Sequence, residues 1–131
     1  MNNSFENKFK NVIPEISHLL GYNTTDNEII KQTTGAFLFG FINGLAQEFK
    51  ESPASIQGYT IGFLVKELGY PESQAVTFSQ DLINSTDPKH HRTTFSIIHR
   101  GLEGYFQYND NDLQALKNNY DEVVKLITDA S

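Results

Sequence analysis

Hydrophobic residues recur along most of the chain at spacings of three and four, whereas strict alternation of apolar and polar residues is scarce. The first pattern places apolar side chains on one face of an α-helix, and the second is typical of a strand. The sequence therefore predicts an all-α protein. Six helices are expected, at about residues 5–20, 26–49, 53–68, 71–83, 95–108 and 113–127. Their short connections predict a single compact domain over residues 1–131, orthogonal or bundle-like.

Three of the expected helices carry features that predict their packing. Pro14 lies inside the first helix, where its ring clashes with the carbonyl four residues earlier, so we expect a kink or a break. In the second helix, Ala36, Gly40 and Gly44 form a stripe of small residues that favours close approach of another helix over contact with a ligand. The third helix is apolar on most sides, which predicts a central position between other helices.

Polar residues mark the expected helix starts. The predicted caps are Thr25 and Asp26 for the second helix, Ser52 followed by Pro53 for the third, Thr93 or Thr94 for the fifth, and residues 109–112 for the sixth. Glycine weakens a helix interior, and Gly101 and Gly104 are expected to weaken the fifth helix. The residues of the fifth helix expected to face the core are Phe95, Ile98, Leu102, Tyr105 and Phe106.

Composition limits the chemistry that the chain can perform. The 131 residues include no cysteine, which excludes disulfides, thiolate zinc sites and a cysteine nucleophile. They include ten phenylalanines, most of which fall on the inward faces of the predicted helices. This placement indicates a filled core, and a Phe-lined pocket is the alternative.

The charge balance limits the partners. Sixteen acidic and ten basic residues give a net charge of −6, which disfavours binding to nucleic acid or an anionic membrane and suits a basic protein partner. The first residues are polar and show no signal peptide, and the apolar stretch at residues 35–46 is too short to span a bilayer. We therefore expect a cytoplasmic protein that binds neither nucleic acid nor membrane.

The candidate metal ligands are three histidines and Glu103. His99 and Glu103 are four residues apart, as a zinc-binding pair on one helix face would be, and His90 and His91 lie nearby. The sequence has no His-Glu-x-x-His pattern, however, and the apolar neighbours of His99 favour a half-buried side chain bonded to Glu103 or to a backbone carbonyl. It also has no Gly-x-Ser-x-Gly elbow, P-loop or dinucleotide-binding motif. We predict no metal, no cofactor and no enzymatic activity, and an enzyme built around His99 and Glu103 is the less favoured alternative.

The densest mixture of residue types found at binding hot spots lies at residues 98–108, because it combines arginine, tyrosine, histidine and glutamate. Arg100 has structural alternatives: it could pair with Glu103 one helical turn away, or anchor a loop through Asp81 or Asp87. The predicted partner surface consists of His99, Arg100, Glu103, Gln107, Tyr108, Asp110 and Asp112.

Two strings in the sequence carry a family resemblance. GAFLFGFIN at residues 35–43, followed later by IHRGLEGY at residues 98–105, resembles a small all-α family of bacterial polymorphic-toxin systems, immunity protein 48. The likeness spans residues 35–108 and leaves the N-terminal third outside it. It implies a cytoplasmic protein that binds and neutralises one cognate toxin, with no catalytic residues.

Two functional hypotheses follow. The first is a non-enzymatic immunity protein that neutralises a cognate toxin by stoichiometric binding, the toxin being basic where it docks. The alternative is a helical domain that binds a small molecule or lipid, or has a regulatory role, through an apolar pocket. The sequence leaves open the oligomeric state, the identity of the toxin and the face that binds it.

Overall fold

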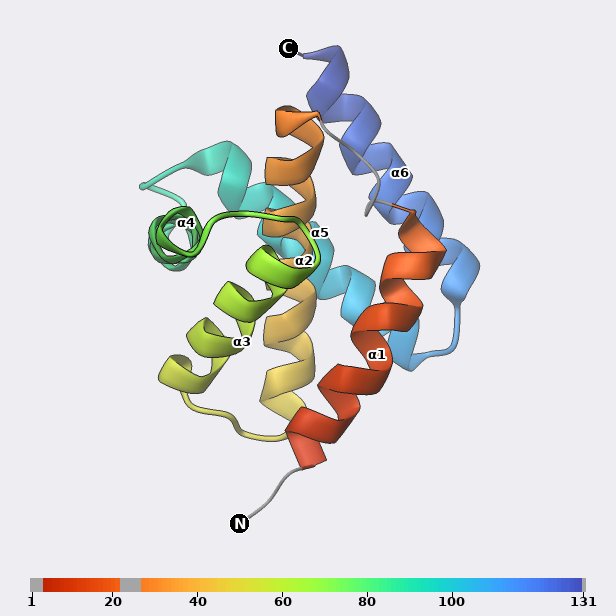
Figure 1. The fold of residues 1–131 in the computed structure, drawn as a ribbon. Helices are drawn as coiled ribbons and strands as arrows, with labels where there is room; N and C mark the ends of the chain where they lie inside the picture. Colours follow the sequence, from red (N-terminus) through yellow and green to blue (C-terminus); the bar gives the residue numbers. More distant parts are fainter. Residues whose placement is uncertain (1–3, 22–26, 131) are drawn as a thin grey trace.

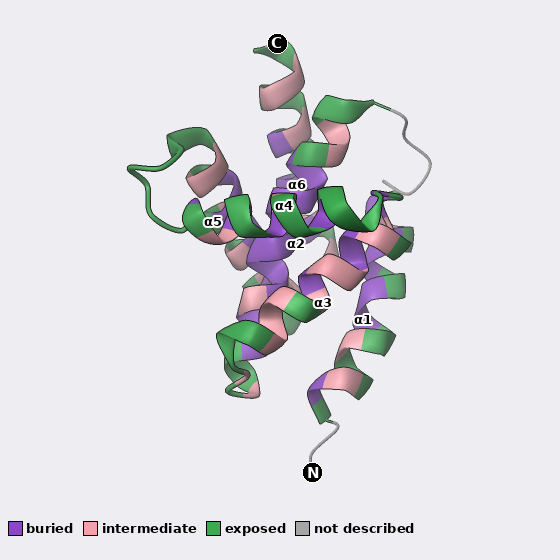
Figure 2. Ribbon diagram, turned by 60° about the vertical axis from the view of Figure 1, so that its left-hand side comes forward, coloured by how far each residue is buried: buried purple, intermediate pink, exposed green. Residues whose placement is uncertain are grey.

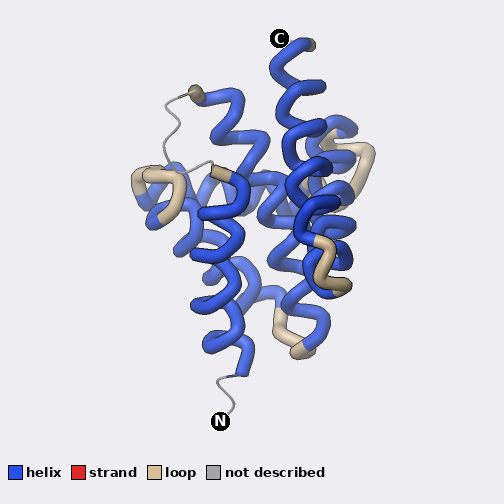
Figure 3. Tube along the Cα trace, turned by 90° about the vertical axis from the view of Figure 1, so that its right-hand side faces the viewer, coloured by secondary structure: helices blue, strands red, loops and turns tan. Residues whose placement is uncertain are grey.

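Six α-helices joined by short loops make up the computed structural model, which describes residues 4–21 and 27–130. They are α1 (Ser4–Leu20), α2 (Glu28–Glu48), α3 (Pro53–Lys66), α4 (Glu72–Asn84), α5 (Arg92–Asn109) and α6 (Leu113–Asp129). No strand occurs in these residues, so the predicted all-α fold class is confirmed (Figure 3). In Figure 1, α2 runs along the middle of the molecule while α4 is seen end-on, as steep packing angles require.

The central helix is α2. Thirteen of its 21 residues are buried, and it packs against α1, α3, α5 and α6. Figure 2 shows buried residues concentrated along α2, whereas α4 is mainly exposed. All six helices contribute side chains to one hydrophobic core, although the extent of the domain over residues 1–131 stays a prediction.

The expectation that the third helix is central is wrong. Only Thr60, Phe63 and Leu64 of α3 are buried. No other described element packs on α3 at Gly58 or Gly62, because a Cβ built at either position meets no atom within 4 Å. The helix packs on both α2 and α4, so more than one of its sides is apolar. Its half-buried hydrophobic residues lie against the edge of the core.

The small-residue stripe of α2 is confirmed as a helix contact. A Cβ built on Gly40 would lie 1.9 Å from the backbone oxygen of Ile98 in α5. The contact is reciprocal, since a Cβ on Gly101 would lie 1.8 Å from the backbone oxygen of Phe37. Gly101 was expected to weaken α5, and the structure shows that it instead lets the two helix backbones touch. Figure 1 shows α5 crossing behind α2.

The helix starts confirm some of the expected caps and correct others. Ser52 caps α3 by accepting a hydrogen bond from the Ser55 amide at 3.1 Å, next to Pro53 in the first turn, as predicted. The cap of α2 is Asn27, whose side chain accepts from the Ile30 amide at 3.1 Å; the expected Thr25 and Asp26 lie outside the described residues.

The cap of α5 is also different from the prediction. His91 accepts a hydrogen bond from the Thr94 amide through Nδ1 at 3.1 Å, so Thr93 and Thr94 belong to the first turn instead of preceding it. A neutral imidazole nitrogen accepts here as a serine or aspartate oxygen would. Pro14 does not break α1, which continues through it as one helix.

Of the five residues of α5 expected to face the core, Ile98 and Tyr105 are buried and Phe95 and Leu102 are half-buried, and the expectation is wrong for Phe106. Its side chain is 52% exposed, while Ile97 is buried. Phe37 and Phe41 are fully buried in α2, as a filled core requires. The face of α5 that packs on the neighbouring helices contains Gly101 and Gly104, and Phe106 lies on the opposite, exposed side.

Tyrosine–glutamate hydrogen bonds join parts of the fold that are distant in the chain. The Tyr70 hydroxyl donates to Glu28 at 3.1 Å, and the Tyr105 hydroxyl donates to Glu48. Burial of the ring is the main cause that raises the pKa of both hydroxyls far above the usual value of 10.0, and the nearby glutamate raises each pKa further. Tyrosinate beside a carboxylate is disfavoured, so both phenols stay protonated in the folded protein.

These raised pKa values predict a loss of stability in alkali. Unfolded tyrosines ionise near pH 10, where Tyr70 and Tyr105 in the folded protein still hold their protons. The unfolded state then binds fewer protons, so stability that is fully present below pH 10 falls as pH rises above it. Thermal unfolding measured between pH 8 and pH 11 is expected to show this fall, and Tyr105→Phe is expected to reduce its slope. Folded protein whose tyrosines all ionise near pH 10, followed by absorbance at 295 nm, would contradict the prediction.

Candidate functional site

The predicted partner surface separates into exposed residues and residues engaged in the fold. His99, Glu103 and Asp110 lie exposed along the outer side of α5 and its C-terminal end. His99 was expected to be half-buried; it is exposed, and its ring lies 4.3 Å from that of Phe95 between centroids. These three side chains remain accessible to a partner.

Arg100 fixes α5 to α6. Its Nε donates to Oδ1 of the buried Asn119 at 2.7 Å, and its Nη2 donates to Glu122. Glu103 lies further away, at 3.7 Å from Nε. The alternative anchor through Asp81 or Asp87 is not formed among the described residues, where Arg100 pairs with Asn119, Glu122 and Glu103 and Asp81 pairs with His90 at 2.9 Å.

The other three predicted residues also have partners within the fold. Gln107 accepts a hydrogen bond from Asn119 at 3.1 Å, and the Tyr108 hydroxyl donates to Glu15 of α1 at 3.0 Å. Asp112 caps α6 by accepting from the Ala115 amide at 3.1 Å, as its place in the cluster at residues 109–112 predicted. That any of the seven residues contacts a partner stays a prediction.

The neighbouring histidines His90 and His91 have different partners and do not form a shared site. His90 pairs with Asp81, and His91 caps α5. Across residues 4–21 and 27–130, no group of three or more His, Cys, Asp or Glu side chains is placed to hold a metal ion.

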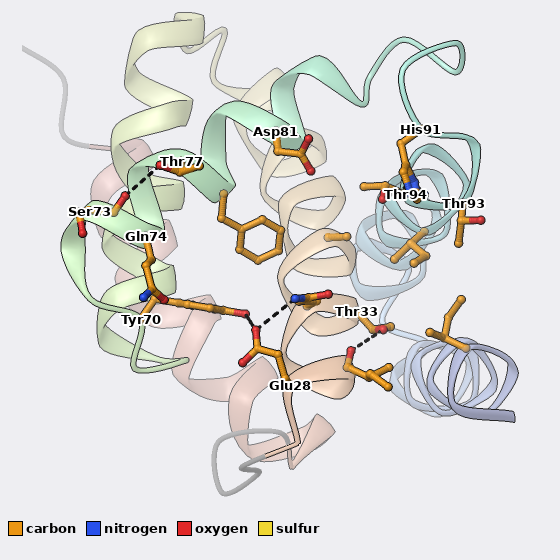
Figure 4. A pocket seen from close by; sticks show the side chains of 16 residues that line it. Glu28, Thr33, Tyr70, Ser73, Gln74, Thr77, Asp81, His91, Thr93 and Thr94 are labelled. Carbon is orange, nitrogen blue, oxygen red and sulfur yellow. Dashed lines mark hydrogen bonds between the residues drawn. The ribbon is translucent and has the colours of Figure 1, made fainter. Parts of the chain in front are cut away.

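A groove of about 770 Å³ opens on the surface of the described chain (Figure 4). The start of α2 and the face of α4 form two of its walls, and the beginning of α5 closes the third. The residues that line it are Glu28, Ile29, Gln32, Thr33, Ala36, Tyr70, Ser73, Gln74, Thr77, Phe78, Asp81, His91, Thr93, Thr94, Ile97 and Ile127.

The groove is acidic and rich in hydroxyl groups. Glu28 and Asp81 are its only charged carboxylates, and its lining contains no lysine or arginine. The Lys31 ammonium group lies 4.6 Å over the centre of the Tyr70 ring, and Lys31 is not part of the lining. Thr33 and Thr77 donate to carbonyl oxygens of their own helices at 2.8 and 3.2 Å, which leaves their oxygens as acceptors.

A small apolar hollow continues the groove across the start of α5. It has a volume of about 110 Å³ and shares Thr93, Ile97 and Ile127 with the groove. Its lining also includes Leu126 of α6, which is 58% exposed, and Arg100 of α5, whose guanidinium is bonded to Asn119 and Glu122. The groove and the hollow thus form one surface, which we call the α2–α4–α5 groove surface.

Sequence reasoning did not identify this surface. Its two carboxylates are separated by more than fifty positions, and only the packing of α4 beside α2 brings Glu28 and Asp81 to one groove. The available signal is weak: Ser73, Gln74 and Thr77 form a polar helix face, which on sequence alone is typical of a solvent-facing side.

None of the described helices combines the length and the apolar character needed to cross a lipid bilayer.

The family model described as immunity protein 48 matches residues 5–128, which includes α1 as well as the region of the two resemblance strings. No curated protein and no solved structure matches the chain.

Proposed function

Because the chain belongs to the immunity protein 48 family, we propose that it binds one cognate bacterial toxin and neutralises it in a stoichiometric complex. The match over residues 5–128 is the observation that carries this proposal. The protein acts in the cytoplasm of the producing cell, without catalysis and without a cofactor. Occupying the toxin's active surface is sufficient for neutralisation, since a bound inhibitor need only exclude the substrate.

The net charge of −6 supports a toxin that is basic where it docks. Complementary charge accelerates diffusional encounter and suppresses binding to other acidic proteins. Salt screens such attraction, with a Debye length of about 10 Å at 0.1 M ionic strength. The association rate of the complex is therefore expected to fall as salt is added.

Co-expression with the product of the adjacent gene tests the proposal. Cells are expected to tolerate that product only when this protein is present, and the two purified chains are expected to form a one-to-one complex in size-exclusion chromatography with light scattering. Cells that grow equally well without this protein, together with no complex between the purified chains, would contradict it.

The ligand-binding alternative has one observation in its favour. The groove volume of about 770 Å³ falls within the range of small-molecule sites. Native mass spectrometry of the purified protein separates the two functions, because a co-purified lipid or metabolite is expected only for the alternative.

A further inference from the structure

We propose that the α2–α4–α5 groove surface is where the partner docks, and that its occupant is a protein segment with a lysine or arginine beside an apolar side chain. This inference rests on the proposed function and adds the face of the molecule that performs it. The predicted surface on α5 is the competing site, and the two are separable by experiment.

The carboxylates of the groove are available to a cation. Glu28 uses Oε2 to accept from Tyr70 and from Gln32 at 3.2 Å, and within the described residues its Oε1 accepts no hydrogen bond. Asp81 uses Oδ1 to pair with His90, and within the described residues its Oδ2 likewise accepts no hydrogen bond. Figure 4 shows Glu28 and Asp81 on different walls of the groove, so a cationic side chain entering it would meet carboxylates from two helices.

The hydroxyl groups of the groove favour the same occupant. Thr33 and Thr77 donate their own protons to helix carbonyls, as described above, so they can only accept from a ligand. Lysine and arginine offer several N–H donors and no acceptor, which matches a site with acceptors on several walls. An anionic occupant would place like charge against Glu28 and Asp81.

The apolar part of the surface supplies contact area. Among the described residues, four large hydrophobic side chains are exposed, and two of them, Ile29 at 38% and Leu126 at 58%, lie on this surface. Ile97 and Ile127 connect them across the start of α5. Long basic side chains bury their hydrocarbon stems on such surface while the charged end reaches a carboxylate, and an apolar centre with a polar rim is the usual anatomy of a protein interface.

The outer side of α5 is less suited to a cationic segment. Its exposed carboxylate Glu103 lies 3.7 Å from Nε of Arg100, which opposes a second positive charge there, whereas the groove that holds Glu28 and Asp81 has no lysine or arginine in its lining. Arg100 also lines the small hollow, but that part of the surface is proposed to bind the apolar side chain. Arg100 itself is held by Asn119 and Glu122 and contributes to joining α5 and α6. A partner that engaged Arg100 would compete with these bonds.

Two double variants with equal charge change test the assignment. Glu28→Gln with Asp81→Asn neutralises the groove, and Glu103→Gln with Asp110→Asn neutralises the outer side of α5. Binding to the purified product of the adjacent gene is measured for both by calorimetry, with circular dichroism and thermal melting as checks of folding. The groove variant is expected to raise Kd at least tenfold, and the α5 variant less than threefold.

Leu126→Ser, at an exposed position, is expected to raise Kd severalfold without changing the melting temperature.

The outcomes separate the docking site from the function. If the unaltered protein binds and the groove variant binds equally well, the groove assignment is overturned and the proposed function stands. An equal loss in both double variants would also overturn it, because general charge steering would then explain the binding. If the unaltered protein does not bind, the proposed function fails and the groove assignment fails with it. A groove variant that has lost its fold is replaced by Asp81→Asn alone, for which the same Kd comparison with Asp110→Asn applies.

Discussion

Replacing Gly101 by alanine is expected to destabilise the protein by at least about 3 kcal/mol, near the upper end of overpacking effects. The added Cβ would lie 1.8 Å from the backbone oxygen of Phe37, far closer than two non-bonded heavy atoms can approach. A flexible side chain could move aside, but here the obstacle is backbone in the middle of α2. Relief would require α2 and α5 to separate, and this would open the core between them. Gly40→Ala is expected to act similarly, because its Cβ meets the backbone oxygen of Ile98 at 1.9 Å.

Gly62→Ala is the matched control for this prediction. Gly62 lies inside α3, and its added Cβ meets no atom within 4 Å. Alanine there is expected to stabilise the protein by about 0.5–1 kcal/mol, because glycine loses more backbone entropy in a helix. Urea unfolding followed by circular dichroism measures all three variants. A Gly101→Ala protein within about 1 kcal/mol of the parent would show that the helices do not make this contact.

Phe37→Ala is expected to lower the free energy of unfolding by about 3–5 kcal/mol. Phe37 is fully buried in α2, and its ring lies 5.4 Å from that of Tyr120 in an edge-to-face arrangement. Removing the ring forfeits its burial and leaves a cavity that the close contact between α2 and α5 cannot collapse, since their backbones already touch.

Phe106→Ala removes the same ring from the exposed side of α5. Because Phe106 is 52% exposed, its loss is expected to change the free energy of unfolding by less than about 1 kcal/mol. The same urea measurement compares the two substitutions. Equal destabilisation by both would mean that Phe106 faces the core, as its spacing along the sequence suggested.

Helix periodicity was sufficient to predict the six helices, because each depends on the local spacing of apolar residues and on nearby capping and breaking residues. The Ser52–Pro53 start of α3 is confirmed, since a cap is bonded within its own first turn. The cap at His91 was not foreseen, because histidine serves as a cap only when its ring presents a neutral nitrogen to the amide.

Packing partners were predictable only where one helix carries an evident feature. The stripe of Ala36, Gly40 and Gly44 indicated a close helix contact, and the contact exists. The sequence could not show that Gly101 supplies the other half, because a lone helix glycine has the same local signature whether it weakens a helix or receives a backbone. The central place of α2, in preference to the equally apolar α3, likewise depends on which faces other helices cover.

The candidate sites also depended on contacts between residues distant in the sequence. The residue types around Arg100 suggested binding, but the partners of Arg100 are Asn119 and Glu122 of α6, which are far along the chain. The groove surface brings Glu28 of α2 and Asp81 of α4 into one hollow that no short motif encodes.

The sequence by itself determined the all-α class, the helix positions, the absence of cysteine chemistry and the resemblance to the immunity protein 48 family. Only the tertiary structure decided that α2 is central, that Phe106 faces outward and that an acidic, partly apolar groove lies between α2, α4 and α5. The physical reason is the range of the interactions. Periodicity and caps act within a few residues, whereas burial and the meeting of charges depend on contacts between helices distant in the chain.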